Sequence, residues 1–118
     1  MKRIFVEVMS STEALKRFER AWRHAGKRKD AEPTVGVGSI GELTTLLSPK
    51  RMELLRYVAE NPELSVRALS QALKRDYKNV HTDVVDLEAN HLLARGKDGG
   101  VRAPYDEIVI RAPLRDAA

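Results

Sequence analysis

The stretch RDYKNVHTDVVDL, residues 75–87, gathers hydrogen-bonding side chains at the start of a predicted helix. Val80, Val84 and Leu87 recur about one turn apart, which predicts a helix that is buried along one stripe. Lysine, asparagine, histidine and threonine can hydrogen-bond the base edges of the DNA major groove, and a helix N-terminus offers free amides to phosphate. A merely solvated face would serve as well with glutamate and lysine throughout, so this variety favours base reading over the alternative of a polar, capped surface helix. The polar side chains are those of Tyr77, Lys78, Asn79, His81 and Thr82.

A helical projection at about 100° per residue separates these side chains by direction. Lys78 and Thr82 point away from the buried stripe, and Asn79 and His81 lie on its flanks. Tyr77 lies nearer to the edge of the core. We therefore expect Lys78 and Thr82 to be free of any packing role.

Catalytic and metal chemistry find no support in the spacing of the polar residues. The histidines His24, His81 and His91 share no metal-ligand spacing, and no serine stands in a nucleophile elbow. Asp83 and Asp86 fall on the polar side of the predicted helix, where we expect solvated charge. We therefore expect no enzyme, no metal and no small-molecule cofactor.

The glycines Gly36, Gly38 and Gly41 spell GxGxxG after a predicted strand. A dinucleotide site also needs a full βαβ unit and an acidic residue about 20 positions on. Glu60 meets that count by position alone, but helices follow the glycines and we expect no parallel strand to return beside the strand before them. The glycines are therefore expected to serve turns.

The composition indicates one compact domain in 118 residues. The absence of cysteine excludes disulfides, thiol catalysis and thiolate metal sites. No apolar run approaches the roughly 20 residues of a membrane span, and the N-terminus is too short and too charged for a signal peptide. We therefore expect a cytoplasmic protein with no membrane partner.

The formal net charge of +4 suits a polyanion partner without requiring one. Residues 1–32 hold nine Lys and Arg against five acids, whereas residues 48–118 hold twelve against eleven. The C-terminal half is therefore nearly neutral. If it binds nucleic acid, it must do so by placing particular charges.

The N-terminal third predicts a strand, a helix and a strand. Alternation over residues 3–9 predicts the first strand, and Ser10 or Ser11 is expected to cap a helix over 12–27, with Glu13 as a capping-box partner. A second strand is expected over 34–39. The helix has an apolar face of Leu15, Phe18, Ala21, Trp22 and Ala25. Its basic face, which we expect to be solvated, holds Lys16, Arg17, Arg20, Arg23 and Lys27.

The remainder predicts helices followed by a hairpin. A short helix is expected in SIGELTTLL, and capped helices are expected after Ser48-Pro49, after Ser65 and after Asp76, the last running to about Asn90. VRAPYDEIVIRA is expected to form one strand paired with LLARGK around Asp-Gly-Gly, which supplies positive φ angles. The residues expected to point inward from the middle helices are Met52, Leu54, Leu55, Val58, Val66, Leu69, Ala72 and Leu73.

This order predicts an α+β fold, a winged helix-turn-helix with an N-terminal strand-helix-strand extension. The extension is expected over residues 1–38, as a possible dimerisation element, and the DNA-binding domain over 39–118. In such folds the third helix lies in the major groove and the hairpin wing reaches the backbone.

From about residue 46 to 112 the chain also resembles small winged-helix, MarR-like transcriptional regulators, often described as antitoxins of type II toxin-antitoxin pairs. The likeness is carried by SPKRMELL, RDYKNVHTDV and APYDEIVI. It departs at Lys74, where such turns usually carry glycine, and at His91-Leu92, where Gly-Leu is usual, so Asn90 or His91 must take the left-handed cap. The resemblance implies a DNA-reading segment of Arg75, Tyr77, Lys78, Asn79, His81 and Thr82. It implies a wing with Arg95, Lys97 and Arg102, to which we add Ser65 at a helix cap.

The function expected from these observations is a sequence-specific DNA-binding regulator and a repressor of its own operon. The resemblance further implies the role of antitoxin in a toxin-antitoxin pair. The alternative is a protein-interaction module that neutralises a toxin or docks a partner without specific DNA reading. The expected partners are double-stranded DNA, a second copy of the chain and a toxin protein. We expect the homodimer to be organised by the N-terminal elements, the alternative being that these pack on the core of their own chain.

Overall fold

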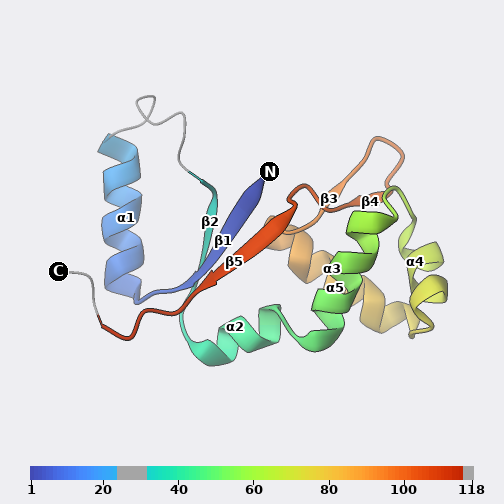
Figure 1. Cartoon of the computed structure of the whole chain (residues 1–118), viewed down its shortest axis with the longest axis horizontal. Coiled ribbons are helices and arrows are strands. Elements are labelled where there is room, and N and C mark those ends of the chain that lie inside the picture. Colours follow the sequence, from blue (N-terminus) through green and yellow to red (C-terminus); the bar gives the residue numbers. More distant parts are fainter. Residues whose placement is uncertain (24–31, 116–118) are drawn as a thin grey trace. The chain divides into compact units, whose positions relative to one another are not determined.

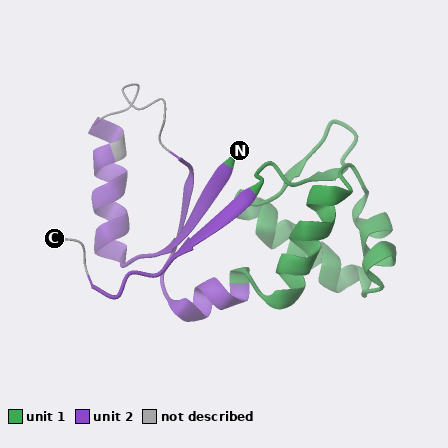
Figure 2. Ribbon diagram, in the orientation of Figure 1, with its two compact units in different colours: residues 1–2, 46–106 green, residues 3–45, 107–118 purple. Residues whose placement is uncertain are grey.

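A computed structural model describes residues 1–23 and 32–115 of the chain and shows an α+β fold (Figure 1). The chain divides into two compact units (Figure 2). Residues 3–45 and 107–118 form one, here called the sheet unit, and residues 1–2 and 46–106 form the other, the helical unit. The prediction instead placed residues 39–118 in one domain.

A parallel three-stranded sheet forms the centre of the sheet unit, in the order β2-β1-β5 (Figure 1). Its strands are β1 (Arg3–Val8), β2 (Thr34–Val37) and β5 (Glu107–Arg111). Ile4 and Val6 alternate along β1 with Arg3 and Phe5 and are almost fully buried, as the period of two predicts, although Glu7 on the other face is buried as well. Ile4 pairs with Ile108 and Val6 with Ile110, so apolar side chains of both strands share one face.

The predicted long second strand of the hairpin is wrong. Only β4 (Val101–Arg102) pairs with β3 (Ala94–Arg95), and residues 107–111 instead join β1 in parallel as β5. Pro104 lies between the two segments and has no amide to donate, which ends an antiparallel ladder. Asp106 then hydrogen-bonds Lys2 through both backbone and side chain, at 2.8 and 2.9 Å, and so begins the pairing of β5 with β1.

Helix α1 (Ser11–Arg23) begins where the sequence predicts, because the Ser10 hydroxyl accepts a hydrogen bond from the amide of Glu13. Arg17 donates two hydrogen bonds, of 2.6 and 2.9 Å, to the buried carboxylate of Glu7 on β1. These bonds raise the pKa of the Arg17 guanidinium above its usual value. The helix therefore meets the sheet through a charged flank.

The apolar face of α1 stays open to solvent in the described residues. Leu15, Phe18 and Trp22 are 60, 68 and 77% exposed. The alternative that this face packs on the core of its own chain is therefore not what the structure shows. The Ala21 side chain, Ala25, Lys27 and the predicted helix end lie outside the described residues.

The glycine-rich segment leads from β2 into the short helix α2 (Ile40–Leu46), as predicted. The Ser39 hydroxyl accepts from the amide of Glu42, and the Glu42 carboxylate accepts from the amide of Gly38 at 2.6 Å. A carboxylate of the chain itself thus occupies the amide that a nucleotide phosphate would need. A parallel strand does return to the sheet, but β5 lies beside β1 and not beside β2.

Three capped helices build the helical unit: α3 (Pro49–Glu60), α4 (Val66–Leu73) and α5 (Tyr77–Ala89). The predicted caps Ser48, Ser65 and Asp76 are confirmed, since each side chain accepts from a backbone amide three residues on. One inward prediction is wrong: Ala72 is exposed, and Ser70 is buried in its place. The buried apolar residues of these helices are Leu54, Leu55, Val58, Val66, Leu69, Val80, Val84 and Leu87.

Two left-handed residues shape the ends of α4 and α5. Lys74 has φ 54° and ψ 46° at the end of α4, a left-handed conformation that glycine usually adopts at helix ends, and His91 has φ 63° after α5. The left-handed cap is therefore His91, since Asn90 has φ −101°. The amides of Lys74 and Arg75 donate to carbonyls of α4, that of Lys74 to Gln71 at 3.1 Å and that of Arg75 to Ser70 at 3.0 Å. These bonds hold the sharp turn without glycine.

Candidate functional site

The exposed side of the first turns of α5 carries four of the predicted residues. Val80 and Val84, on the opposite side, have no solvent exposure. The four are Lys78, Asn79, His81 and Thr82. Asp76 accepts a hydrogen bond from the amide of Asn79 at 3.3 Å, which leaves the Asn79 side chain outward on a capped first turn. The expected separation of a buried stripe from a polar surface is confirmed.

Tyr77 extends this surface to α4. Tyr77 is 40% exposed, and the Arg67 guanidinium lies over its ring with the central carbon 4.8 Å from the ring centroid. The centroid of the His81 ring lies 5.9 Å from that of the Tyr77 ring, and the two ring planes are tilted by 31°. A cation above an aromatic face is an attractive pairing. Arg67 therefore belongs to the site, and its exposed place two residues after the cap Ser65 was the available signal.

Arg75 does not join this surface. Its Nη2 donates to Asp83 at 2.7 Å, its side chain is only 16% exposed, and its Nη1 is buried without a hydrogen-bond partner among the described residues. Five of the six residues expected to read DNA are thus exposed on the start of α5, whereas the Arg75 side chain is largely buried against Asp83. Its role is to hold the turn between α4 and α5.

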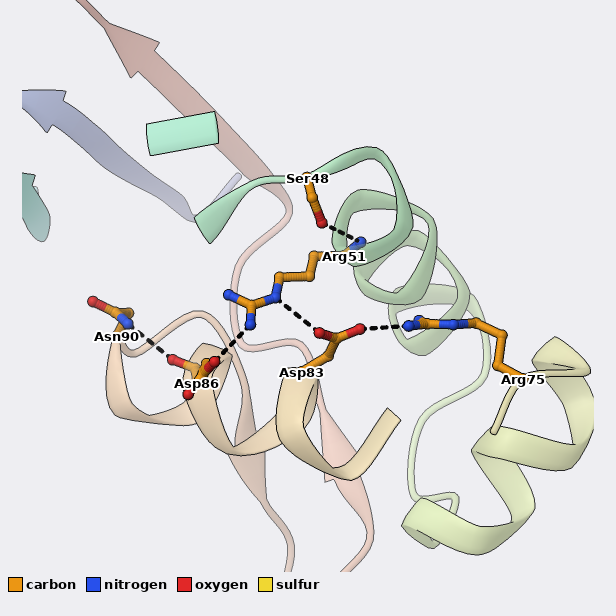
Figure 3. Close-up of polar contacts among 6 residues, drawn as sticks. All are labelled: Ser48, Arg51, Arg75, Asp83, Asp86 and Asn90. Atoms are coloured by element: carbon orange, nitrogen blue, oxygen red, sulfur yellow. Dashed lines mark hydrogen bonds and ion pairs between the residues drawn. The ribbon is translucent and has the colours of Figure 1, made fainter. Parts of the chain in front are cut away.

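A buried arginine, Arg51, joins Arg75 and Asp83 in a network of ion pairs (Figure 3). The sequence did not predict this role for Arg51. Arg51 of α3 donates to Asp83 at 3.0 Å and to Asp86 at 2.6 Å. Burial lowers the pKa of the Arg51 guanidinium, but hydrogen bonds to Asp83 and Asp86 outweigh it and the pKa stays above its usual value. The expectation of solvated charge is wrong for Asp83, whose side chain is 14% exposed, while that of Asp86 remains 47% exposed.

Ser65 serves the helix cap in this structure. Its hydroxyl accepts from the amide of Ala68 at 3.1 Å while the residue stays exposed. A capping hydroxyl keeps its own proton free to donate outward. Ser65 therefore remains available to a phosphate only as a hydrogen-bond donor.

Of the three cations predicted on the hairpin, two form ion pairs and one does not in the described residues. Arg95 donates to Glu88 at 2.8 Å and to the Gly99 carbonyl at 3.1 Å. Arg102 is paired with Glu63, which lies between α3 and α4. Lys97 is exposed, and the described part of the chain contains no ion pair of its side chain. One free cation therefore stands at the hairpin tip.

The chemistry of this surface is hydrogen bonding and charge. Within residues 1–23 and 32–115, no group of three or more His, Asp or Glu side chains is arranged to hold a metal ion. None of the helices described there has the length and apolarity to cross a membrane. The exposed groups on α5 and the hairpin offer donors and positive charge to an anionic ligand.

Comparison with known proteins places the chain in a family. Residues 46–110, which run from the end of α2 through most of β5, match the family described as HVO_A0114. Because the match covers more than half of the 118 residues, the chain belongs to this family. No curated protein and no solved structure matches the chain.

Proposed function

We propose that this protein is a sequence-specific DNA-binding transcriptional regulator of the winged helix-turn-helix, MarR-like kind. The observation that carries the proposal is the exposed polar start of α5. Lys78 and Thr82 stand on a capped helix directly opposite a stripe with no solvent exposure. Since these side chains support no packing, their variety is best explained by a ligand with mixed donors and acceptors, such as base edges.

The local architecture supports this function. Helix α4 ends at Leu73, three residues form the turn, and α5 begins at Tyr77, which is the order of a helix-turn-helix. The β3–β4 hairpin follows α5 at once, in the place of a wing. In this proposal α5 is the recognition helix and the hairpin lies along the DNA backbone.

Phosphate contacts fall to side chains more than to the helix amides. The Asp76 carboxylate already accepts from the amide of Asn79, so a phosphate at the start of α5 meets an occupied amide and a negative charge. Lys97 at the hairpin tip, which has no ion pair among the described residues, is the cation best placed to contact the phosphate backbone of DNA. Base contacts from Lys78, Asn79, His81 and Thr82 then specify the site, and Tyr77 with Arg67 lines its edge.

We further propose that the regulator acts as a homodimer in the cytoplasm, through the exposed apolar face of α1. An antiparallel pair of α1 helices with Phe18 at the two-fold axis brings Leu15 toward Trp22 of the partner subunit. A dimer doubles the length of DNA that is read. Repression of its own operon, as the antitoxin of a toxin-antitoxin pair, is the role we assign to it.

The open face of α1 also favours a second candidate function, a protein-interaction module that neutralises a toxin. DNA binding separates the two. Fluorescence anisotropy with duplexes tiled across the protein's own promoter, against random duplex of equal length, should find one segment bound about 10³-fold more tightly than random DNA. Equal binding to all duplexes would contradict the proposed function and favour the module.

A further inference from the structure

Glu63 connects the loop between α3 and α4 to the hairpin. Its amide donates to the Val101 carbonyl at 3.0 Å, and the Val101 amide donates to the Leu64 carbonyl at 2.9 Å. Glu63 has φ 71°, a left-handed conformation that is uncommon for a residue with a side chain. The loop thus forms an isolated antiparallel bridge to β4, between Leu64 and Val101, at the base of the hairpin.

Two hairpin glycines make room for this residue. A Cβ on Gly100 would lie 2.7 Å from backbone atoms of Glu63, and a Cβ on Gly96 would overlap its carboxylate. The same Cβ on Gly96 would lie 3.1 Å from Nε of Arg102, which donates to that carboxylate. Glycine at both positions therefore lets the Glu63 carboxylate sit against the hairpin and hold Arg102.

The pair remains at the surface, where a phosphate can reach it. The side chains of Arg102 and Glu63 are 56 and 43% exposed. With Glu63 in place, the pair carries no net charge, and a phosphate that approaches Arg102 also meets a carboxylate. Attraction and repulsion then nearly cancel at this point of the hairpin.

We propose that Glu63 sets the DNA affinity of this protein by neutralising Arg102 on the hairpin. This inference rests on the proposed DNA-binding function. Because phosphate contacts carry no base information, Glu63 lowers binding to all DNA alike and leaves sequence choice to α5. Removal of its charge adds about one phosphate contact.

The test compares Glu63→Gln with the parent full-length chain by anisotropy on promoter and random duplexes over a range of salt. Each neutralised phosphate contributes a slope of about 0.9 in log K against log salt, so the variant should steepen the slope by about one and bind about five-fold more tightly near 0.15 M salt. The same factor is expected on both duplexes. Glu60→Gln, an equal charge change at an exposed site on α3, is the matched control and should change the slope by much less.

Arg102→Ala in both backgrounds completes a double-mutant cycle. Without Arg102, the Glu63→Gln change should no longer steepen the slope beyond the Glu60 control. Weaker binding by Glu63→Gln, which would mean that the carboxylate positions Arg102 for phosphate, overturns the inference. So does an effect equal to that of Glu60→Gln, or one that persists without Arg102.

Two readouts keep these outcomes separate from folding and from the function itself. Melting curves identify a misfolded variant, and Glu63→Asn, which tolerates a left-handed backbone, then replaces it. Exchange of the Arg102 Nε–H, measured by NMR without DNA, should accelerate in the neutral variant. If the parent chain binds no duplex even at low salt, the proposed function is wrong. If the parent binds and the Glu63→Gln variant binds equally well, only this inference is wrong.

Discussion

The carboxylate of Asp83 accepts a hydrogen bond of 2.7 Å from Nη2 of Arg75 across the turn that joins α4 to α5 (Figure 3). The other oxygen of Asp83 accepts from Nε of Arg51 on α3 at 3.0 Å. One side chain of α5 is therefore tied to two other parts of the helical unit. These bonds orient the helix whose opposite surface we propose to read DNA.

We expect Asp83→Ala to lower the free energy of unfolding by about 3 kcal/mol, because it leaves the largely buried guanidinium of Arg75 without its partner and leaves that of Arg51 with Asp86 alone. Urea unfolding monitored by circular dichroism measures this change. Asp86→Ala is the comparison, since the Asp86 side chain is 47% exposed and its pair with Arg51 is screened by solvent. Equal losses for the two variants would contradict the assigned role of Asp83.

We expect Val84→Ala to destabilise the helical unit by about 2–3 kcal/mol. The Val84 side chain has no solvent exposure, so its removal opens a cavity in the core. The double change Lys78→Ala, Thr82→Ala should shift stability by only about 0.5 kcal/mol or less, since both residues are exposed. Melting curves of both variants compare the two. Early melting of the double variant would mean that its side chains support packing.

On DNA we expect the opposite order. The Lys78/Thr82 double variant should lose specific promoter binding by tenfold or more, because each lost base contact costs about 1–3 kcal/mol. Random DNA should lose less, mainly through the missing lysine charge. A double variant that binds the promoter like the parent shows that α5 is not the reading helix.

We expect Lys97→Ala to weaken binding to promoter and random DNA by a similar factor and to reduce the salt slope by about one. The resemblance also implied a place for Arg102 in the wing, but its pair with Glu63 leaves Lys97 as the cation without an ion pair among the described hairpin residues. Titrations of both duplexes at several salt concentrations measure the slope. A loss confined to the promoter would mean that Lys97 contacts bases.

We expect sedimentation to show a dimer of the full chain at tens of micromolar, and Phe18→Glu to make it a monomer, since the change places charge at the proposed two-fold axis. Removal of the N-terminal residues is a poorer test, because β5 would lose its partner β1. A parent chain that sediments as a monomer contradicts self-association through α1.

Local interactions made much of this structure predictable from the sequence. The caps Ser48, Ser65 and Asp76 hydrogen-bond amides three residues on, so residue type and position suffice to predict where α3, α4 and α5 begin. The stripe of Val80 and Val84 follows from helical periodicity for the same reason. The exposed residues of α5 could be listed because a buried stripe defines its opposite side.

Long-range pairing was decided by the tertiary structure. Residues 107–111 have the composition of a strand in any sheet, and only the folded chain pairs them with β1 near the other end of the sequence. Likewise, Arg75 looked like a DNA-reading residue and Asp83 like a solvated charge, because the sequence holds 21 cations and 17 anions and does not say which of them meet. Helix caps and stripes depend on neighbours within one or two turns, whereas strand partners and buried ion pairs depend on distances that only the folded backbone sets.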